Sequence, residues 1–136
     1  MSALGDEIKA MIASNGPITL ERYMELALGH PEHGYYMGRD PFGAAGDFIT
    51  APEISQMFGE LLGLLAAEVW ASMGRPRPVR LIELGPGRGT MMSDALRAAR
   101  IVPDFRSAID VTLVETSPTL AEIKHETLLT SGAPVG

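Results

Sequence analysis

The residues best suited to chemistry lie in segment 79–90, where an apolar run leads through Glu83 into Gly85, Gly87 and Gly89. Glycine lets a ligand approach the backbone more closely than any Cβ would allow. A helix that starts directly after a strand also leaves its first N–H groups available to a ligand. The segment therefore indicates a cofactor-binding loop, with a glycine-rich turn that only permits tight packing as the alternative.

The spacing of these glycines and the charge of Glu83 bear on which cofactor would bind. A dinucleotide-binding loop has the spacing G-x-G-x-x-G, but counting from Gly85 the third position is Thr90. A carboxylate two residues before the loop would repel a pyrophosphate and attract a cationic ammonium group. S-adenosylmethionine (SAM) carries such an ammonium and no phosphate, so we expect SAM in preference to a nicotinamide dinucleotide.

A second acid, Glu115, ends another apolar run, residues 111–114, whose composition is typical of a strand. A helix-compatible segment over residues 90–100 separates the two expected strands. In open parallel sheets, ligands bind beyond the carboxyl ends of the strands, where Glu83 and Glu115 would lie together. An acid at the end of the second strand can hold ribose hydroxyls in both NAD and SAM enzymes, so Glu115 predicts a nucleoside without specifying which one.

Helices are expected to precede this sheet. The longest would begin at Thr50, which forms a capping-box pattern with Glu53, and apolar residues then recur at helical spacing until about Gly74. Gly59 and Gly63 leave one strip of this helix without bulk, which favours close packing of another backbone over a ligand contact. Two shorter amphipathic helices are expected over residues 4–15 and 19–28.

The segment 29–46 is rich in Gly, Pro, His and Tyr and is expected to form loops. Its His30, Glu32 and His33 do not have the spacing of ligands on one helix face, and Pro31 prevents such a helix. We therefore expect no metal site.

Composition excludes several classes of protein. The chain has 136 residues, no cysteine and a formal net charge of −6. The lack of cysteine rules out disulfides and thiolate metal sites, and the acidic balance argues against nucleic-acid binding, which usually relies on a basic patch. No secretory signal is visible at the N-terminus, and no apolar region is long enough to span a bilayer, so a cytoplasmic protein is expected.

Four segments carry a resemblance to a known family: residues 26–36 with His30-Pro31 and Gly34-Tyr35-Tyr36, residues 46–55, Phe58-Gly59, and residues 83–90. Together they resemble the MidA-like proteins, class I SAM-dependent methyltransferases that include the mitochondrial complex I assembly-factor methyltransferase. The resemblance implies the N-terminal part of an α/β Rossmann-like fold in residues 76–136, preceded by a helical extension in residues 1–75. It also implies SAM as cofactor and methylation of a protein arginine in a respiratory-chain subunit.

The resemblance assigns cofactor roles to seven residues: the loop to Gly85, Gly87 and Gly89, the methionine ammonium to Glu83, the ribose to Glu115, and closure over the methionine end to Asp47 and Thr50. Two of these have a competing structural interpretation. Asp47 follows a glycine and is equally typical of a turn, and Thr50 is favoured as a helix cap. No catalytic residue is identified.

Members of this family are much longer than the present chain, which supplies only two of the parallel strands. The free strand edge and apolar faces would favour association with another polypeptide. A non-catalytic assembly partner that keeps the fold is therefore one alternative function, and an NAD(P)-binding oxidoreductase fragment is a less favoured one. The expected location is the bacterial cytoplasm, or the mitochondrial matrix if the chain is eukaryotic.

Overall fold

The computed structural model describes residues 2–37 and 49–131, which belong to two compact units. The first unit is Met1–Asp40 with Ser117–Thr119, and the second is Pro41–Thr116 with Leu120–Gly136. The predicted division into domains at residues 75 and 76 stays a prediction. The second unit includes two helices that precede residue 76.

The first unit contains the helices α1 (Ala3–Asn15) and α2 (Leu20–Gly29). Ser2 caps α1 and Thr19 caps α2, each through a side-chain oxygen that accepts a hydrogen bond from the N–H group three residues on. These two helices confirm the ones predicted over residues 4–15 and 19–28, with ends that agree to within one residue.

The turn that follows α2 is held by its own side chains. His30 Nδ1 accepts hydrogen bonds from the N–H groups of Glu32 and His33, both at 3.2 Å, and His30 Nε2 lies 3.4 Å from Glu7 Oε2. Both ring nitrogens of His30 thus have partners within this unit. Among the residues that the structure describes, no group of three His, Cys, Asp or Glu side chains could hold a metal ion.

In the second unit, the long helix predicted from Thr50 is two helices, α3 (Ala51–Ile54) and α4 (Gln56–Ser72). The break falls at Ser55, which has an extended backbone and caps α4 by accepting a hydrogen bond from the N–H of Met57 at 3.2 Å. The predicted capping box is wrong, because Thr50 makes no side-chain cap hydrogen bond.

The sheet has two parallel strands, β1 (Val79–Leu84) and β2 (Ile109–Val114), paired in register from Val79↔Ile109 to Leu84↔Val114. Between them lie α5 (Thr90–Ala98), the 3-10 turn η1 (Ala99–Ile101) and α6 (Pro103–Ala108), and α7 (Pro118–Ser131) follows β2. Parallel strands joined through helices are the unit from which Rossmann-like folds are built. The predicted partial Rossmann-like fold is therefore confirmed.

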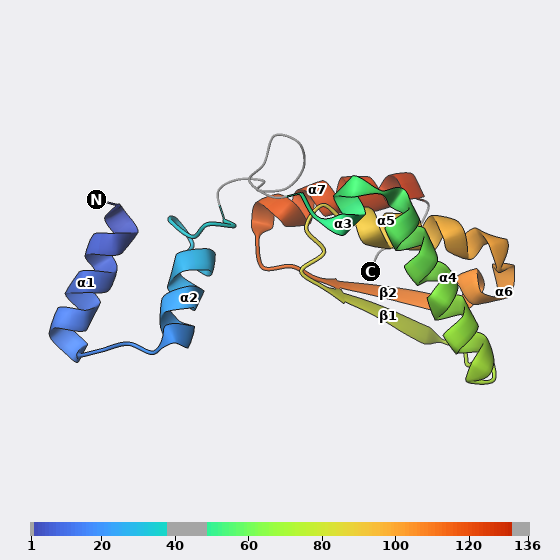
Figure 1. Cartoon of the computed structure of the whole chain (residues 1–136), viewed down its shortest axis with the longest axis horizontal. Helices are drawn as coiled ribbons and strands as arrows, with labels where there is room; N and C mark the ends of the chain where they lie inside the picture. The colour runs from blue at the N-terminus through green and yellow to red at the C-terminus, as the bar shows by residue number, and fades with distance from the viewer. Residues whose placement is uncertain (1, 38–48, 132–136) are drawn as a thin grey trace. The chain divides into compact units, whose positions relative to one another are not determined.

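One face of the sheet packs against the helices, with α4, α5 and α7 on the same side of both strands (Figure 1). The buried cluster joins Trp70 of α4, Leu96 of α5, Phe105 of α6 and Leu128 of α7 to Val111 of β2. Burial of such apolar side chains stabilises the unit and fixes these helices relative to the strand ends.

Helices α4 and α5 approach closely at two glycines. A Cβ atom on Gly59 would lie 2.7 Å from the carbonyl oxygen of Met91, and one on Gly63 would lie 2.7 Å from the Cα atom of Ala95. These distances are too short for any residue with a side chain, so the predicted packing role of Gly59 and Gly63 is confirmed.

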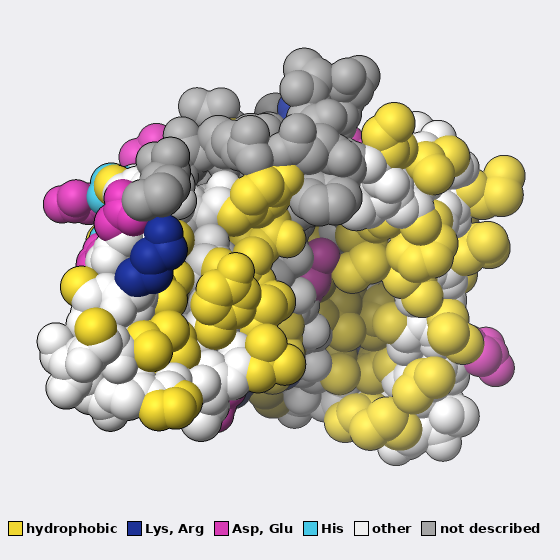
Figure 2. Space-filling model, turned by 60° about the vertical axis from the view of Figure 1, so that its left-hand side comes forward, with side chains coloured by type: hydrophobic (Ala, Val, Ile, Leu, Met, Phe, Trp, Pro, Cys, Tyr) yellow, Lys and Arg dark blue, Asp and Glu magenta, His cyan; other side chains and the backbone are white. Residues whose placement is uncertain are grey.

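Apolar side chains on the opposite face of the sheet and along α4 are exposed to solvent. Ile82 is 58% exposed and Leu84 is 75% exposed, and apolar residues along α4 such as Leu61 and Leu65 are exposed to a similar extent. Figure 2 shows that hydrophobic side chains are exposed in groups rather than singly. A hollow of about 320 Å³ lies between α4 and β1 and is lined mainly by apolar side chains. No described helix is both long and apolar enough to cross a membrane.

Candidate functional site

The loop between β1 and α5 has the backbone geometry that its glycines permit. Gly85, Gly87 and Gly89 have φ values of 66°, 55° and 79°, in the left-handed region where other residues are strained. The N–H of Gly85 donates to the carbonyl of Val114 at 2.9 Å, which ties the start of the loop to the end of β2. Gly89 then occupies the cap position of α5, where no side chain makes a cap hydrogen bond.

Glu83 is a buried carboxylate near the end of β1. The residue is 9% exposed, and within the described part of the chain its Oε2 atom has no hydrogen-bond partner. Burial raises the pKa of Glu83, and the positive charge of Lys124 opposes this with a smaller effect. Because a buried carboxylate without a full set of partners costs free energy, a cation placed beside it would stabilise the protein.

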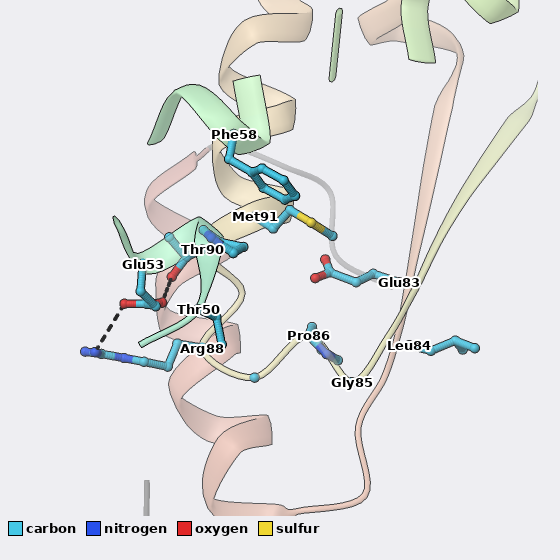
Figure 3. A pocket seen from close by; sticks show the side chains of 12 residues that line it. Thr50, Glu53, Phe58, Glu83, Leu84, Gly85, Pro86, Arg88, Thr90 and Met91 are labelled. Atoms are coloured by element: carbon cyan, nitrogen blue, oxygen red, sulfur yellow. Dashed lines mark hydrogen bonds and ion pairs between the residues drawn. The ribbon is translucent and has the colours of Figure 1, made fainter. Parts of the chain in front are cut away.

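Glu83 and the glycine loop line one side of a cavity of about 310 Å³. The other side is supplied by Thr50, which precedes α3, by Glu53 of α3 and by Phe58 of α4. The carboxylate of Glu83 points into this space, whereas the side chain of Leu84 points away from it (Figure 3). The cavity therefore combines two acids, Glu53 and Glu83, with bare backbone and apolar surface.

A second carboxylate, that of Glu53, reaches from α3 to the start of α5. Glu53 Oε1 accepts a hydrogen bond from the hydroxyl of Thr90 at 2.6 Å, and Glu53 Oε2 lies 3.7 Å from Nη1 of Arg88 (Figure 3). The sequence pattern predicted that Glu53 would cap its own helix, so this contact was missed. Residues 37 positions apart carry no local signal that they will meet.

Comparison with known proteins identifies the family. Residues 61–135 match the family described as "Putative S-adenosyl-L-methionine-dependent methyltransferase". The chain belongs to this family. Protein arginine methyltransferase NDUFAF7 from Homo sapiens is 45% identical over 126 residues, which cover 91% of this chain and 29% of that protein. Its mitochondrial homologue from Drosophila melanogaster is 44% identical over 126 residues, covering 91% of this chain and 28% of that protein.

A solved structure gives the same result for the methyltransferase fold. The crystal structure of a Burkholderia thailandensis protein bound to S-adenosyl-homocysteine matches with a TM-score of 0.79 and 33% identity, and the match covers 95% of this chain and 34% of that one. The chain thus spans about a third of the length of this relative and slightly less of the others. The expected resemblance and SAM as the family's cofactor are confirmed, which leaves the nicotinamide alternative without support.

The residues of this methyltransferase-family chain fit SAM at the cavity. The unpartnered oxygen of Glu83 suits the ammonium group, and Gly85 and Gly87 line the cavity with backbone alone. Thr50 lines the same cavity, so four of the predicted residues come together here. Their contacts with the cofactor stay predictions.

Of the other three predicted residues, the two that the structure describes, Gly89 and Glu115, do not line this cavity. Gly89 ends the loop without lining the cavity, and a Cβ added to it would approach Lys124. Glu115 follows β2 and does not line the cavity; its Oε1 accepts a hydrogen bond from the N–H of Thr116 at 2.8 Å. Asp47 lies outside the described residues. The ribose role of Glu115 and the closing role of Asp47 also stay predictions.

Proposed function

We propose that this chain forms the SAM-binding part of a methyltransferase that modifies a protein arginine. The observation that carries the proposal is the carboxylate of Glu83, buried beside the glycine loop with one oxygen lacking a hydrogen-bond partner among the described residues. A buried anion of this kind is stabilised by a cation held against it. The methionine part of SAM provides an ammonium group, whereas a dinucleotide would bring phosphates that the carboxylate repels.

Five of the seven predicted residues have a role in this proposal. Glu83 binds the ammonium, the backbone at Gly85 and Gly87 lies against the methionine part, and Glu115 at the end of β2 holds the ribose hydroxyls. Thr50 borders the methionine end of the cavity. SAM, when bound, supplies a methyl group already activated by its sulfonium. The contribution of the protein is therefore alignment of the acceptor nitrogen and exclusion of water.

The proposed acceptor is the guanidinium group of a protein arginine. The relatives from several animals are named protein arginine methyltransferases, and we extend that substrate class to this chain. The formal charge of −6 suits a cationic substrate, since it favours the approach of positive charge. We further propose a respiratory-chain subunit as the protein substrate and a link to complex I assembly. The bacterial cytoplasm, or the mitochondrial matrix in a eukaryote, is the proposed location.

A second candidate function is that of a non-catalytic assembly partner with the SAM fold. It is favoured by the exposed apolar residues of α4 and β1, which provide a surface for another polypeptide. The two candidates differ in whether methyl transfer occurs when that polypeptide is present.

The first test is isothermal titration of the chain with S-adenosyl-homocysteine, with NAD as a control ligand. We expect saturable binding of S-adenosyl-homocysteine only, and its loss in a Gly87→Val variant, because valine at a φ of 55° is strained and fills the loop. Circular dichroism of the variant checks that its secondary structure is intact. Binding of NAD alone, or of neither ligand, would contradict the proposal for this chain.

A further inference from the structure

Glu53 links the helical segment before the sheet to the end of the glycine loop. Its carboxylate contacts Thr90 and Arg88, which flank Gly89 at the end of that loop. The side chain of Glu53 is only 17% exposed, so water competes weakly for these contacts. A hydrogen bond between a hydroxyl and a carboxylate at 2.6 Å is in the short, charge-assisted range.

The position of Thr90 explains why this contact matters for the loop. Thr90 is the first residue of α5, directly after the left-handed Gly89 that ends the loop. Left-handed glycines make a loop open to a ligand, but they also leave it with more backbone freedom than other residues would. An anchor at Thr90 fixes the end of the loop that lies away from the sheet, while the hydrogen bond from Gly85 to Val114 fixes its start.

We propose that Glu53 is a positioning residue for the cofactor loop. Both of its carboxylate oxygens are engaged by protein groups, so it acts through Thr90 and Arg88 rather than by contact with the cofactor. Because it lines the same cavity as Glu83, its effect is exerted where the cofactor is proposed to bind. The inference rests on the proposed function, and it assigns a task to a segment that precedes the Rossmann-like sheet.

The charge on Glu53 adds to this effect. An anion near the first turn of a helix is stabilised by the partial positive charge of the free N–H groups there. Arg88 balances the negative charge from the solvent side, where its own side chain is 40% exposed. Removal of the carboxylate would therefore remove its contacts with both Thr90 and Arg88.

The test is a mutant cycle on the full chain, read out by the affinity for S-adenosyl-homocysteine. We expect Glu53→Ala and Thr90→Val each to weaken binding about tenfold, which is typical for the loss of a hydrogen bond to a charged group. The affinity of the double variant should lie within about threefold of that of the weaker-binding single variant, because both changes remove the same interaction. Thr90→Ser, which keeps the hydroxyl, should restore affinity to within about threefold of the wild type.

Glu68→Ala is the matched control, since Glu68 is an exposed glutamate on α4 that does not line the cavity. It should leave the affinity unchanged. Independent, additive losses from Glu53→Ala and Thr90→Val would overturn the inference, as would a Thr90→Ser variant that binds as poorly as Thr90→Val.

Amide hydrogen exchange separates failure of this inference from failure of the proposed function. The N–H of Ser93 bonds to the carbonyl of Gly89 at 3.0 Å, so its exchange reports on the junction of loop and helix without any ligand. We expect faster exchange there in Glu53→Ala and Thr90→Val, and wild-type exchange in Thr90→Ser. If the wild type binds no S-adenosyl-homocysteine, the proposed function fails, while unchanged exchange in Thr90→Val would refute the positioning role of Glu53.

Discussion

Replacement of Glu83 by glutamine should strengthen the fold and weaken cofactor binding. The variant keeps the size of the side chain but removes a negative charge that is buried with one oxygen unpartnered among the described residues. An unsatisfied buried polar group costs about 1–3 kcal/mol, and more if it is charged. The amide of glutamine is still a buried polar group and keeps part of that cost, and Lys124 already offsets part of the negative charge in the wild type. We therefore expect the free energy of unfolding to rise by about 1 kcal/mol at pH 7.

The pH dependence of this gain follows from the direction of the pKa shift. Burial raises the pKa of Glu83 above its ordinary value of 4.5, so the folded protein binds this proton more tightly than the unfolded chain does. The wild type therefore loses stability as the pH rises from 4.5 through the raised pKa. Urea unfolding of both proteins should show a stability gap that is small near pH 4 and widens toward neutral pH. A stability difference of the same size near pH 4 and at neutral pH would refute the reasoning.

Cofactor affinity should change in the opposite direction. Loss of the charged partner of the ammonium group should weaken binding of S-adenosyl-homocysteine by about 10- to 100-fold, the range for a hydrogen bond to a charged group. Methylthioadenosine, which lacks the amino-acid part, provides the control and should bind both proteins equally. Titration calorimetry at pH 7 measures both ligands. Equal weakening for the two ligands would place Glu83 away from the ammonium group.

Two further predictions concern packing and the exposed surface. Gly63→Ala should destabilise the chain by about 2 kcal/mol, because the new Cβ meets the backbone of α5. Gly29→Ala should be nearly neutral, because a Cβ at Gly29 meets no other atom within 4 Å. Urea unfolding followed by tryptophan fluorescence measures both variants, and equal stability of the two would contradict the close approach of α4 and α5. The chain should also self-associate at high concentration in analytical ultracentrifugation, and Leu65→Lys should reduce this more than Glu68→Lys, because only the first removes exposed apolar surface. Equal effects of the two lysine variants would indicate that charge rather than apolar contact controls association.

The sequence predicts the elements near the sheet well because their signals are local. The strand that runs through Glu83 and the glycines after it are adjacent in the chain, and the positive φ values of Gly85, Gly87 and Gly89 agree with the loop predicted from them. The close packing at Gly59 and Gly63 is likewise visible as two residues without side chains on one strip of a helix.

Prediction from the sequence fails where a residue has two possible partners. Thr50 and Glu53 match a capping box, but Ser55 provides a competing cap one turn later, and this divides the predicted helix into α3 and α4. The carboxylate freed in this way bonds to Thr90 instead. No spacing rule covers such a contact, because it depends on how α3 packs against the start of α5.

Glu83 lines both the cavity beside the glycine loop and the apolar hollow between α4 and β1. A polypeptide segment seated in that hollow would exclude water from Glu83. Its desolvated carboxylate would then gain more from a neighbouring ammonium group, since the attraction between charges grows as the surroundings become less polar. Occupation of the hollow and cofactor binding should therefore favour each other. With the hollow filled, the same buried acid would make the stability of the protein depend more strongly on the bound cofactor.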